Sequence, residues 1–305
     1  MHDETPAEPP PRGGVPGRSA ARVRLEPGLH LIATPIGAAR DITLRALDIL
    51  ASADVLAAED TRSLRHLMEI HGVPLGGRPL WAYHDHNGAA VRPRILAALA
   101  DGRSVAYASE AGTPLVADPG YQLARSVVAE GHVLRAAPGP SAVLAALAVS
   151  GLPSDRFLFA GFPPATAGAR AAFLAELAEV PATVILFESP KRVMRTLMEL
   201  VQSFGEGREA VVCRELTKRF EEVTRGTLGS LAEVMADREV RGEIVLVIGR
   251  PLAVVVAEGD LDAALRKALG RQSVKMAAAE VAASLGLPRR DVYQRALRLA
   301  DEGGE

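Results

Sequence analysis

Three short stretches of the sequence combine carboxylates with imidazole, hydroxyl or guanidinium groups. They are "AAEDTR" (57–62), "YHDHN" (83–87) and "ASEAGTPLVADPG" (108–120). Carboxylate and imidazole groups act as general acids and bases, and in groups of three or four they also bind metal ions. These stretches can act together only if the fold brings them to one place.

The stretch "YHDHN" raises the question of a metal site. In an extended segment His84 and His86 would project from one side and Asp85 from the other. A hydrolytic metal site needs three or four protein ligands, and no matching carboxylate motif accompanies the other histidines. We therefore expect no metal, and expect polar loop residues that contact a substrate or cap a helix.

The acidic residues also have structural interpretations. Asp60 stands immediately before a predicted helix, and Asp41 opens "DITLRAL", so both are candidate N-caps. A cap accepts hydrogen bonds from the first free N–H groups of a helix, and acids near that end are favoured by the helix dipole. Capping and chemistry are compatible, but capping alone would not require Glu59, Thr61 and Arg62 beside Asp60.

The stretch 108–120 is longer than a simple turn. A strand-to-helix connection typically needs only about 2–6 residues. Gly112 and Gly120 permit positive φ or a close ligand, while Pro114 and Pro119 stiffen the chain and remove two donors. Such a loop is suited to presenting backbone groups to a flat, mostly neutral ligand rather than to chelating an ion.

The elements that must position these stretches form a regular α/β alternation from residue 28 onward. In an open α/β sheet, ligands bind outside the carboxyl ends of the strands. The three stretches fall at such ends, together with "ATPIGAARD" (33–41) and "PGPSA" (138–142). The pattern predicts strands over 29–34, 54–60, 79–85, 103–109 and 132–137, and helices over 41–53, 61–72, 89–102 and 120–131, in a largely parallel sheet.

A second α/β series follows a predicted helix over 141–151. It includes a hairpin-like portion, so its sheet is expected to be mixed. An all-helical tail comes last, and its "SLGLPRRDV" resembles the turn of a helix-turn-helix unit. The second series has predicted strands over 156–162, 182–188, 209–216, 221–227 and 242–249 and helices over 168–180, 190–205 and 230–238. We predict a disordered tail over 1–26, α/β domains over 27–150 and 151–252, and a helical segment over 258–305.

Composition narrows the class of protein. The chain is 48% hydrophobic and 24% charged with a net charge of −2, as in soluble globular proteins. Its single cysteine, Cys213, excludes an intramolecular disulfide and is expected to be a buried, unreactive strand residue. The sequence has no bilayer-spanning apolar run and no apolar core of a secretory signal, so we expect a cytoplasmic protein. It also lacks G-x-G-x-x-G, the P-loop and the G-x-S-x-G elbow.

Several longer motifs, taken in order, reveal a resemblance. They are "TPIGAARDITLRALDILASADVLAAEDTR", "YHDHN", "SEAGTPLVADPG", "PGPSA", "GLPSDRFLFAGFPP", "ILFESPKRV", "CRELTKRFEEVTRGT" and "RGEIVLVIG". Over about residues 28–250 the chain resembles the bacterial 16S ribosomal RNA cytidine 2′-O-methyltransferases of the small-subunit methyltransferase I type, in the tetrapyrrole methylase superfamily. The resemblance implies two α/β domains of the tetrapyrrole methylase type followed by a small C-terminal helical domain.

The resemblance implies S-adenosyl-L-methionine as methyl donor, held between the two α/β domains without a Rossmann glycine fingerprint. The chain departs from the family's usual pattern at Glu110, where Asp is usual, and at Ala38-Ala39, where Asn-Leu is usual. The first change keeps the charge and adds a methylene, and the second removes a polar contact from the first loop. The donor contacts it implies are Thr34, Pro35, Gly37, Ala111, Gly112, Thr113, Leu115, Ala117, Ser141, Ala142, Phe187 and Glu188.

The implied reaction is in-line transfer of a methyl group to a ribose 2′-hydroxyl of 16S rRNA in the small ribosomal subunit. The protein must align oxygen, carbon and sulfur and can help to remove the hydroxyl proton. The candidates for that second task are Glu59, Asp60, His84, Glu110 and Lys218. The candidates for holding the RNA and its phosphates are Arg62, His84, His86, Arg192, Arg214, Lys218 and Arg219, with Arg289 and Arg290 in the tail. The family also implies a homodimer.

The helical tail is basic although the chain as a whole is not. Residues 266–298 hold eight basic and two acidic side chains, a local charge of +6. This charge indicates that the segment binds RNA phosphates and is not only a solvent-exposed helical surface. Two other classes stay open. A methylase of a small tetrapyrrole would share both α/β domains but have no use for this tail, and a hydrolase built around "HDH" would need a metal and no methyl donor.

Overall fold

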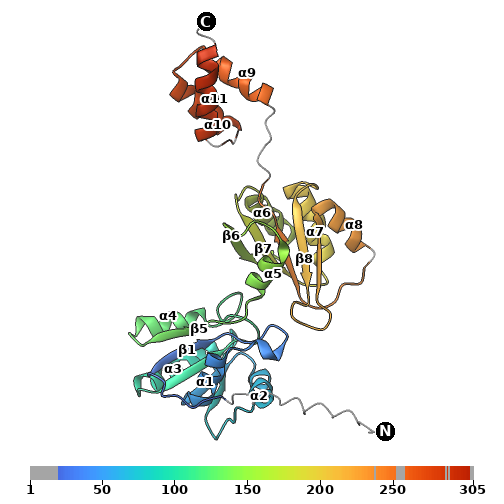
Figure 1. Ribbon diagram of the computed structural model, residues 1–305. Coiled ribbons are helices and arrows are strands. Elements are labelled where there is room, and N and C mark those ends of the chain that lie inside the picture. Colours follow the sequence, from blue (N-terminus) through green and yellow to red (C-terminus); the bar gives the residue numbers. More distant parts are fainter. Residues whose placement is uncertain (1–19, 237, 252–257, 286, 288, 303–305) are drawn as a thin grey trace, which may run out of the picture.

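The computed structural model describes residues 20–236, 238–251, 258–285, 287 and 289–302 (Figure 1). Most of the tail predicted to be disordered, residues 1–19, lies outside the described residues. The described chain forms two five-stranded sheets with helices, and then a group of three helices near the C-terminus. This is the α/β class with a helical C-terminal part that the sequence predicts.

The first sheet is entirely parallel. Its order is β3-β2-β4-β1-β5, so the first strand in sequence lies inside the sheet. The strands β1, β2 and β4 are buried along their whole length. Their sequences are therefore mostly apolar and do not alternate between apolar and polar residues. The strands are β1 (Gly28–Ile32), β2 (Val55–Ala58), β3 (Leu80–Ala82), β4 (Ser104–Ala108) and β5 (Leu134–Ala137).

Helices cover both faces of this sheet. Leu56 and Ala58 face one layer, which contains α1 (Leu44–Ser52) and α2 (Thr61–Ile70). Val55 and Ala57 face the other layer, which contains α3 (Gly88–Ala100) and α4 (Tyr121–Ala129). Burial of a Val or Leu side chain contributes about 1.5–3 kcal/mol, so the alternation along β2 fixes which helices lie on which face.

The two predicted helix caps have different outcomes. Asp60 is confirmed as the N-cap of α2, because its carboxylate accepts hydrogen bonds from Arg62 N and Ser63 N. Asp41 does not cap α1: it ends a short 3-10 turn, η1 (Ala39–Asp41), and Thr43 accepts the hydrogen bond from Ala46 N instead. The extended residue Ile42 separates the turn from the helix, so the cap falls two residues later than predicted.

The second sheet is mixed, as predicted. Its order is β6-β7-β10-β8-β9, with β6 and β7 parallel and the other neighbours antiparallel. The strands are β6 (Phe157–Gly161), β7 (Thr183–Glu188), β8 (Glu209–Arg214), β9 (Glu222–Thr227) and β10 (Ile244–Ile248). The helices α6 (Ala167–Ala178), α7 (Val193–Phe204) and α8 (Leu228–Ala236) pack on one face.

The opposite face of the second sheet is covered by α5 (Ala142–Ser150), which follows the last strand of the first sheet. Val143, Ala146 and Leu147 of this helix share a buried cluster with Val245 and Val247 of β10. The guanidinium of Arg225 in β9 donates to the carbonyls of Val149 and Ser150, the free acceptors at the end of α5. The two halves of the molecule therefore share one layer.

The three C-terminal helices have a core of their own. They are α9 (Glu258–Leu269), α10 (Val274–Leu285) and α11 (Arg289–Glu302). Leu265, Ala278, Val281, Ala296 and Leu299 are among the buried side chains that they share. The α10–α11 pair occupies the place predicted for a helix-turn-helix unit. No described helix is both long and apolar enough to cross a bilayer.

Candidate active site

The loops at the carboxyl ends of the first sheet are tied to one another. Thr34 and Gly112 exchange backbone hydrogen bonds of 2.9 and 3.0 Å between N and O, so the loop after β1 pairs with the loop after β4. The hydroxyl of Thr34 donates to Ser109 O, and that of Thr113 donates to Pro140 O at 2.9 Å. Three loops that are distant in sequence thus form one rigid rim.

The loop 109–120 is held in an unfavourable backbone conformation. Leu115 has a φ of 73° and Ala117 a φ of 61°, in the left-handed region that side chains with a Cβ rarely adopt. The hydroxyl of Tyr107 in β4 donates to Pro119 O at 3.0 Å, and a Cβ on Gly120 would lie 2.9 Å from the Tyr107 ring. Strain of about 1–3 kcal/mol per residue persists only where the surroundings fix it, and such sites are often functional.

A cavity of about 330 Å³ lies between this rim and the second sheet. Its size is at the lower end of the range for small-molecule sites, about 300–1,000 Å³. Phe162 and Phe187 form an apolar wall, with ring centroids 5.5 Å apart. We call it the apolar cavity, and its lining includes Ile36, Ala111, Thr113, Val116, Ala117, Asp118, Ser141, Ala142, Val143, Phe162, Phe187, Glu188, Pro190 and Val245.

Most of the predicted donor contacts lie at this cavity. Ala111, Thr113, Ala117, Ser141, Ala142, Phe187 and Glu188 line it. Thr34 and Gly112 form the bridge of the rim, Pro35 and Gly37 line a neighbouring cavity, and Leu115 packs toward the core beneath β4. Phe162 and Asp118 also line the apolar cavity and are not among the predicted donor contacts, although both lie within the motifs quoted above.

The neighbouring cavity, about 410 Å³, is polar. Glu59, Glu110 and Asp118 enter it from the first half, and Lys218 and Glu243 from the second. The structure thus brings together three of the predicted catalytic residues, Glu59, Glu110 and Lys218. We call it the polar cavity.

Carboxylate crowding changes the acidity of this group. Burial raises the pKa of Glu59, although the hydrogen bond from Glu110 N to Glu59 Oε2, at 3.3 Å, acts in the other direction. Burial, and then the charges of Glu59 and Glu110, raise the pKa of Asp118 to about 7. Asp118 Oδ2 is buried without a hydrogen-bond partner among the described residues. A carboxyl group with a pKa near neutrality can exchange a proton during a reaction.

Lys218 enters the polar cavity as a cation. Its Nζ lies 2.9 Å from Glu215 Oε1 and 3.2 Å from Glu243 Oε2. Burial alone would lower the pKa of Lys218, but these two carboxylates outweigh it and raise the pKa. A permanently charged ammonium can stabilise negative charge or hold a phosphate, but it cannot remove a proton.

The loop around Lys218 contacts the rim directly. Ala38 N donates to Thr217 Oγ1 at 3.1 Å, and a Cβ on Gly37 would lie 2.5 Å from Lys218 Cγ. Glycine at position 37 therefore allows the first loop and this loop to meet. Glu215 and Thr217 also have positive φ, so strained backbone borders the site on both sides.

Asp60 and Arg62 lie outside the cavities described above. Asp60 is occupied by its capping bonds and by the Arg62 guanidinium, 3.2 Å away. The bonds to Arg62 lower the pKa of Asp60. Arg62 is highly exposed, with 91% of its side chain accessible, at the edge of the first half.

His84 and His86 lie in a turn before α3, not in an extended segment as predicted. The carbonyl of His84 accepts from Asn87 N and Gly88 N, so the chain reverses there. His84 and Asp118 both line a third cavity of about 370 Å³, which we call the outer cavity. Within the described residues no group of three or more His, Cys, Asp or Glu side chains is arranged to hold a metal ion.

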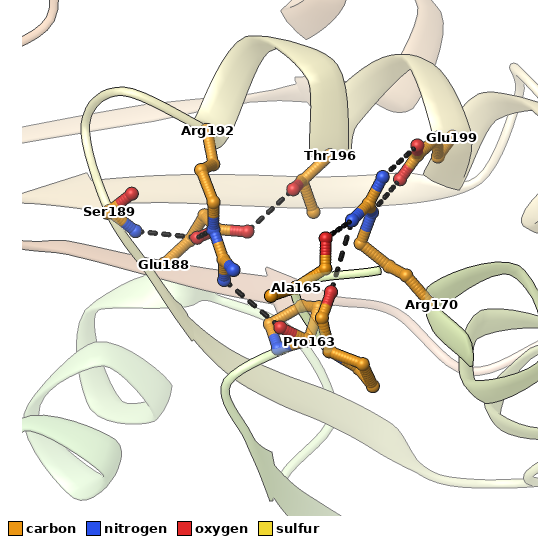
Figure 2. Close-up of polar contacts among 9 residues, drawn as sticks. Pro163, Ala165, Arg170, Glu188, Ser189, Arg192, Thr196 and Glu199 are labelled. Carbon is orange, nitrogen blue, oxygen red and sulfur yellow. Dashed lines mark hydrogen bonds and ion pairs between the residues drawn. The ribbon is translucent and has the colours of Figure 1, made fainter. Parts of the chain in front are cut away.

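Glu188 and Arg192 belong to a buried polar network in the second half, shown in Figure 2. Glu188 accepts from Ser189 N at 2.7 Å, from Arg192 Nε at 2.8 Å and from Thr196 Oγ1 at 2.6 Å. Arg192 also donates to Pro163 O at 3.1 Å, so it holds the segment after Phe162. Next to it, Arg170 donates to Ala165 O and pairs with Glu199.

The remaining predicted RNA contacts lie away from the two central cavities. Arg214 pairs with Glu222 at 3.1 Å on the second sheet. Arg289 and Arg290 are exposed at the start of α11. Arg219 lies over the ring of the exposed Phe220, near Lys218. Cys213 is fully buried in β8, which confirms the predicted buried strand residue, and burial raises the pKa of its thiol to about 11.

Comparison with known proteins places this geometry in context. The family model described as Tetrapyrrole (Corrin/Porphyrin) Methylases matches residues 28–232, and one described as RsmI C-terminal HTH domain matches residues 255–300. A protein of Mesorhizobium japonicum named Ribosomal RNA small subunit methyltransferase I is 47% identical over 92% of this chain and 95% of its own. A protein of Mycobacterium tuberculosis with the same name is 40% identical over 90% and 96%.

A solved structure of uroporphyrin-III C-methyl transferase from Thermus thermophilus, complexed with S-adenyl homocysteine, has a similar fold. Its TM-score is 0.51 at 21% identity, over 73% of this chain and 97% of that one. At this identity the likeness concerns the fold alone.

Proposed function

Because the chain belongs to the tetrapyrrole methylases, and among them to the ribosomal RNA small subunit methyltransferase I family, we propose that it methylates 16S rRNA. We further propose that the methyl group comes from S-adenosyl-L-methionine and goes to the 2′-hydroxyl of a cytidine ribose. The observation that carries the proposal is the apolar cavity, donor-sized, which shares Asp118 with a polar cavity containing carboxylates and a lysine.

The apolar cavity suits the proposed donor in size and chemistry. Phe162 and Phe187 offer faces for an aromatic base, and Thr113 and Ser141 offer polar groups at the wall. When bound, the donor supplies an electrophilic methyl group; the residues of this chain orient it and exclude water.

The polar cavity suits the acceptor. A ribose has hydroxyls flanked by phosphates, and this cavity combines carboxylates with the Lys218 ammonium. Further basic side chains on α9 to α11 would hold more distant phosphates, which contribute affinity independent of sequence. A small tetrapyrrole acceptor would leave this charge without a role. We also propose that the protein acts as a homodimer in the cytoplasm.

The test is methylation of small ribosomal subunits that lack the modification, followed by nuclease digestion and mass spectrometry. We expect 2′-O-methylcytidine at one site. Methyl groups on a base, or on a porphyrinogen in place of RNA, would contradict the proposal. A thermal-shift comparison of S-adenosylmethionine with divalent metals separates a methylase from a metal-dependent hydrolase. A ligand raises the midpoint of thermal unfolding only if it binds the folded protein, so the methyl donor should raise it for a methylase and a metal for a hydrolase.

A further inference from the structure

Asp118 lies where three cavities meet. It lines the apolar cavity with Phe187, the polar cavity with Glu59 and the outer cavity with His84. Of the residues lining these three cavities, Asp118 alone contributes to all of them. Under the proposed function, donor and acceptor would approach one another at this junction.

Two of the other candidates for removing a proton, Glu59 and Lys218, are engaged, and a third, His84, has a buried Nδ1 without a partner among the described residues but lines the outer cavity and neither of the two central ones. Glu59 accepts from Glu110 N, and Glu110 itself is exposed. The Lys218 ammonium is held between two carboxylates. Asp118, by contrast, has a buried carboxylate oxygen that no described group satisfies. Leaving a buried acceptor unpaired is destabilising, so such an atom is retained where a ligand or a reaction uses it.

We propose that Asp118 is the catalytic base, whose carboxylate accepts the proton of the attacking ribose hydroxyl. This inference rests on the proposed function. As the hydroxyl oxygen forms its bond to the methyl carbon, the carbon–sulfur bond breaks and its electron pair stays on sulfur. The hydroxyl proton passes to Asp118, which later releases it to water. Charge balances, because a cation and a carboxylate become a neutral thioether and a carboxylic acid.

The environment sets the pH at which Asp118 can act. Because its pKa is raised to about 7, the carboxylate is the minor form below neutrality and the major form above it. Activity should therefore rise with pH through about 7. The charged or titratable groups around Asp118, from the elements that line its cavities, are Glu59, Tyr83, His84, Asp85, Arg92, Tyr107, Glu110, Tyr121, Glu188, Lys218 and Glu243.

The decisive experiment compares Asp118→Asn with wild type in single-turnover methylation of small subunits. We expect the single-turnover rate constant to fall about 10²-fold or more, in the range for loss of a general base. The affinity for S-adenosylmethionine, measured by calorimetry, should stay within a few-fold of wild type. The pH dependence through neutrality should vanish. Asp101→Asn removes an exposed carboxylate at the end of α3 and serves as the matched control.

A second variant separates Asp118 from Glu59. Glu59→Gln should move the rise in activity to lower pH, because it removes a negative charge that raises the pKa of Asp118. If Glu59→Gln abolishes turnover while Asp118→Asn retains it, the inference is wrong and Glu59 is the base. If the wild-type protein methylates no ribose, both the proposed function and this inference fail. If the wild type is active and Asp118→Asn is equally active, only the inference about Asp118 is wrong.

Stability provides a readout without substrate. A raised pKa in the folded state means that the protonated form of Asp118 is preferred there, so its stabilising effect is complete below pH 3.8 and is lost as pH rises to about 7. Asp118→Asn should therefore match wild type in thermal unfolding near pH 4 and exceed it increasingly up to pH 7. A constant difference at all pH values would contradict the assignment.

Discussion

The two halves of the molecule bury polar side chains in opposite ways. In the second half, Glu188 has three hydrogen-bond donors, and Arg170 and Arg192 are each shared between a carboxylate and backbone carbonyls (Figure 2). On the rim of the first sheet, Asp118 keeps a buried oxygen that no described residue satisfies, beside two other carboxylates. The first arrangement fixes a loop, whereas the second leaves a group ready to react. Both sites contain buried, charged side chains, so burial and charge do not tell them apart. What distinguishes the structural carboxylate from the reactive one is whether its hydrogen bonds are complete.

The largest expected effect tests the satisfied network. Glu188→Ala should lower the free energy of unfolding by about 3 kcal/mol, because it leaves Arg192 without its carboxylate. Urea unfolding followed by circular dichroism measures the change. A loss below about 1 kcal/mol would show that the network does not stabilise the second half, and the comparison would break.

The next effect concerns the rim. Gly112→Val should weaken binding of S-adenosylmethionine at least 100-fold, about 2.7 kcal/mol, because valine disfavours the φ of 81° that the bridge to Thr34 requires. Calorimetry gives the affinity. Gly102→Val is the matched control: its φ is 73°, and a Cβ there meets no atom within 4 Å. Equal affinity in both variants would remove the rim from the donor site.

A smaller change sharpens the network result. Thr196→Val keeps the shape of the side chain but removes one donor to Glu188, which should cost about 1.5–3 kcal/mol for a hydrogen bond to a charged group. Methylation by the folded variant should remain near that of wild type. If Thr196→Val instead abolishes turnover without changing stability, the network serves the reaction directly.

The smallest effect per residue concerns the basic helices. Neither Arg289 nor Arg290 has a carboxylate partner among the described residues, whereas Arg295 is paired with Asp262 at 2.7 Å. Changing Arg289 and Arg290 to Glu should weaken binding to small subunits and lower the salt slope by about one unit per lost contact, with donor affinity unchanged. Arg295→Gln should mainly lower stability. Identical salt slopes for the wild type, the Arg289/Arg290 double variant and Arg295→Gln would mean that α9 to α11 serve in packing or dimerisation and do not bind RNA.

Much of this arrangement follows from the sequence, and the exceptions have physical causes. Parallel and mixed sheets, the cap at Asp60 and inert Cys213 were predictable because hydrophobic period and cap chemistry are local. The position of Thr43 as the cap in place of Asp41 depends on a single extended residue, Ile42. The turn at His84 depends on Asn87, whose side chain accepts from His84 N.

The role of Asp118 could not be read from the sequence. The sequence shows that it is an acid, but its lack of a hydrogen-bond partner among the described residues depends on how all of its neighbours pack. The same holds for Arg192, which the sequence offered as a phosphate ligand. The i, i+4 spacing to Glu188 was a signal for the ion pair that the structure contains.

The position of α5 has a consequence for how the protein unfolds. This helix is continuous in sequence with the first sheet, yet its apolar side covers the second sheet. Detaching α5 would expose Val245 and Val247 of the second sheet, and it would break up the buried cluster that Ile36, in the loop after β1, shares with this helix. We therefore expect residues 28–249 to unfold in one cooperative transition. A ligand held in the apolar cavity, which Ser141 and Ala142 line, would then stabilise both sheets at once, by about 2.7 kcal/mol at 100 times its Kd.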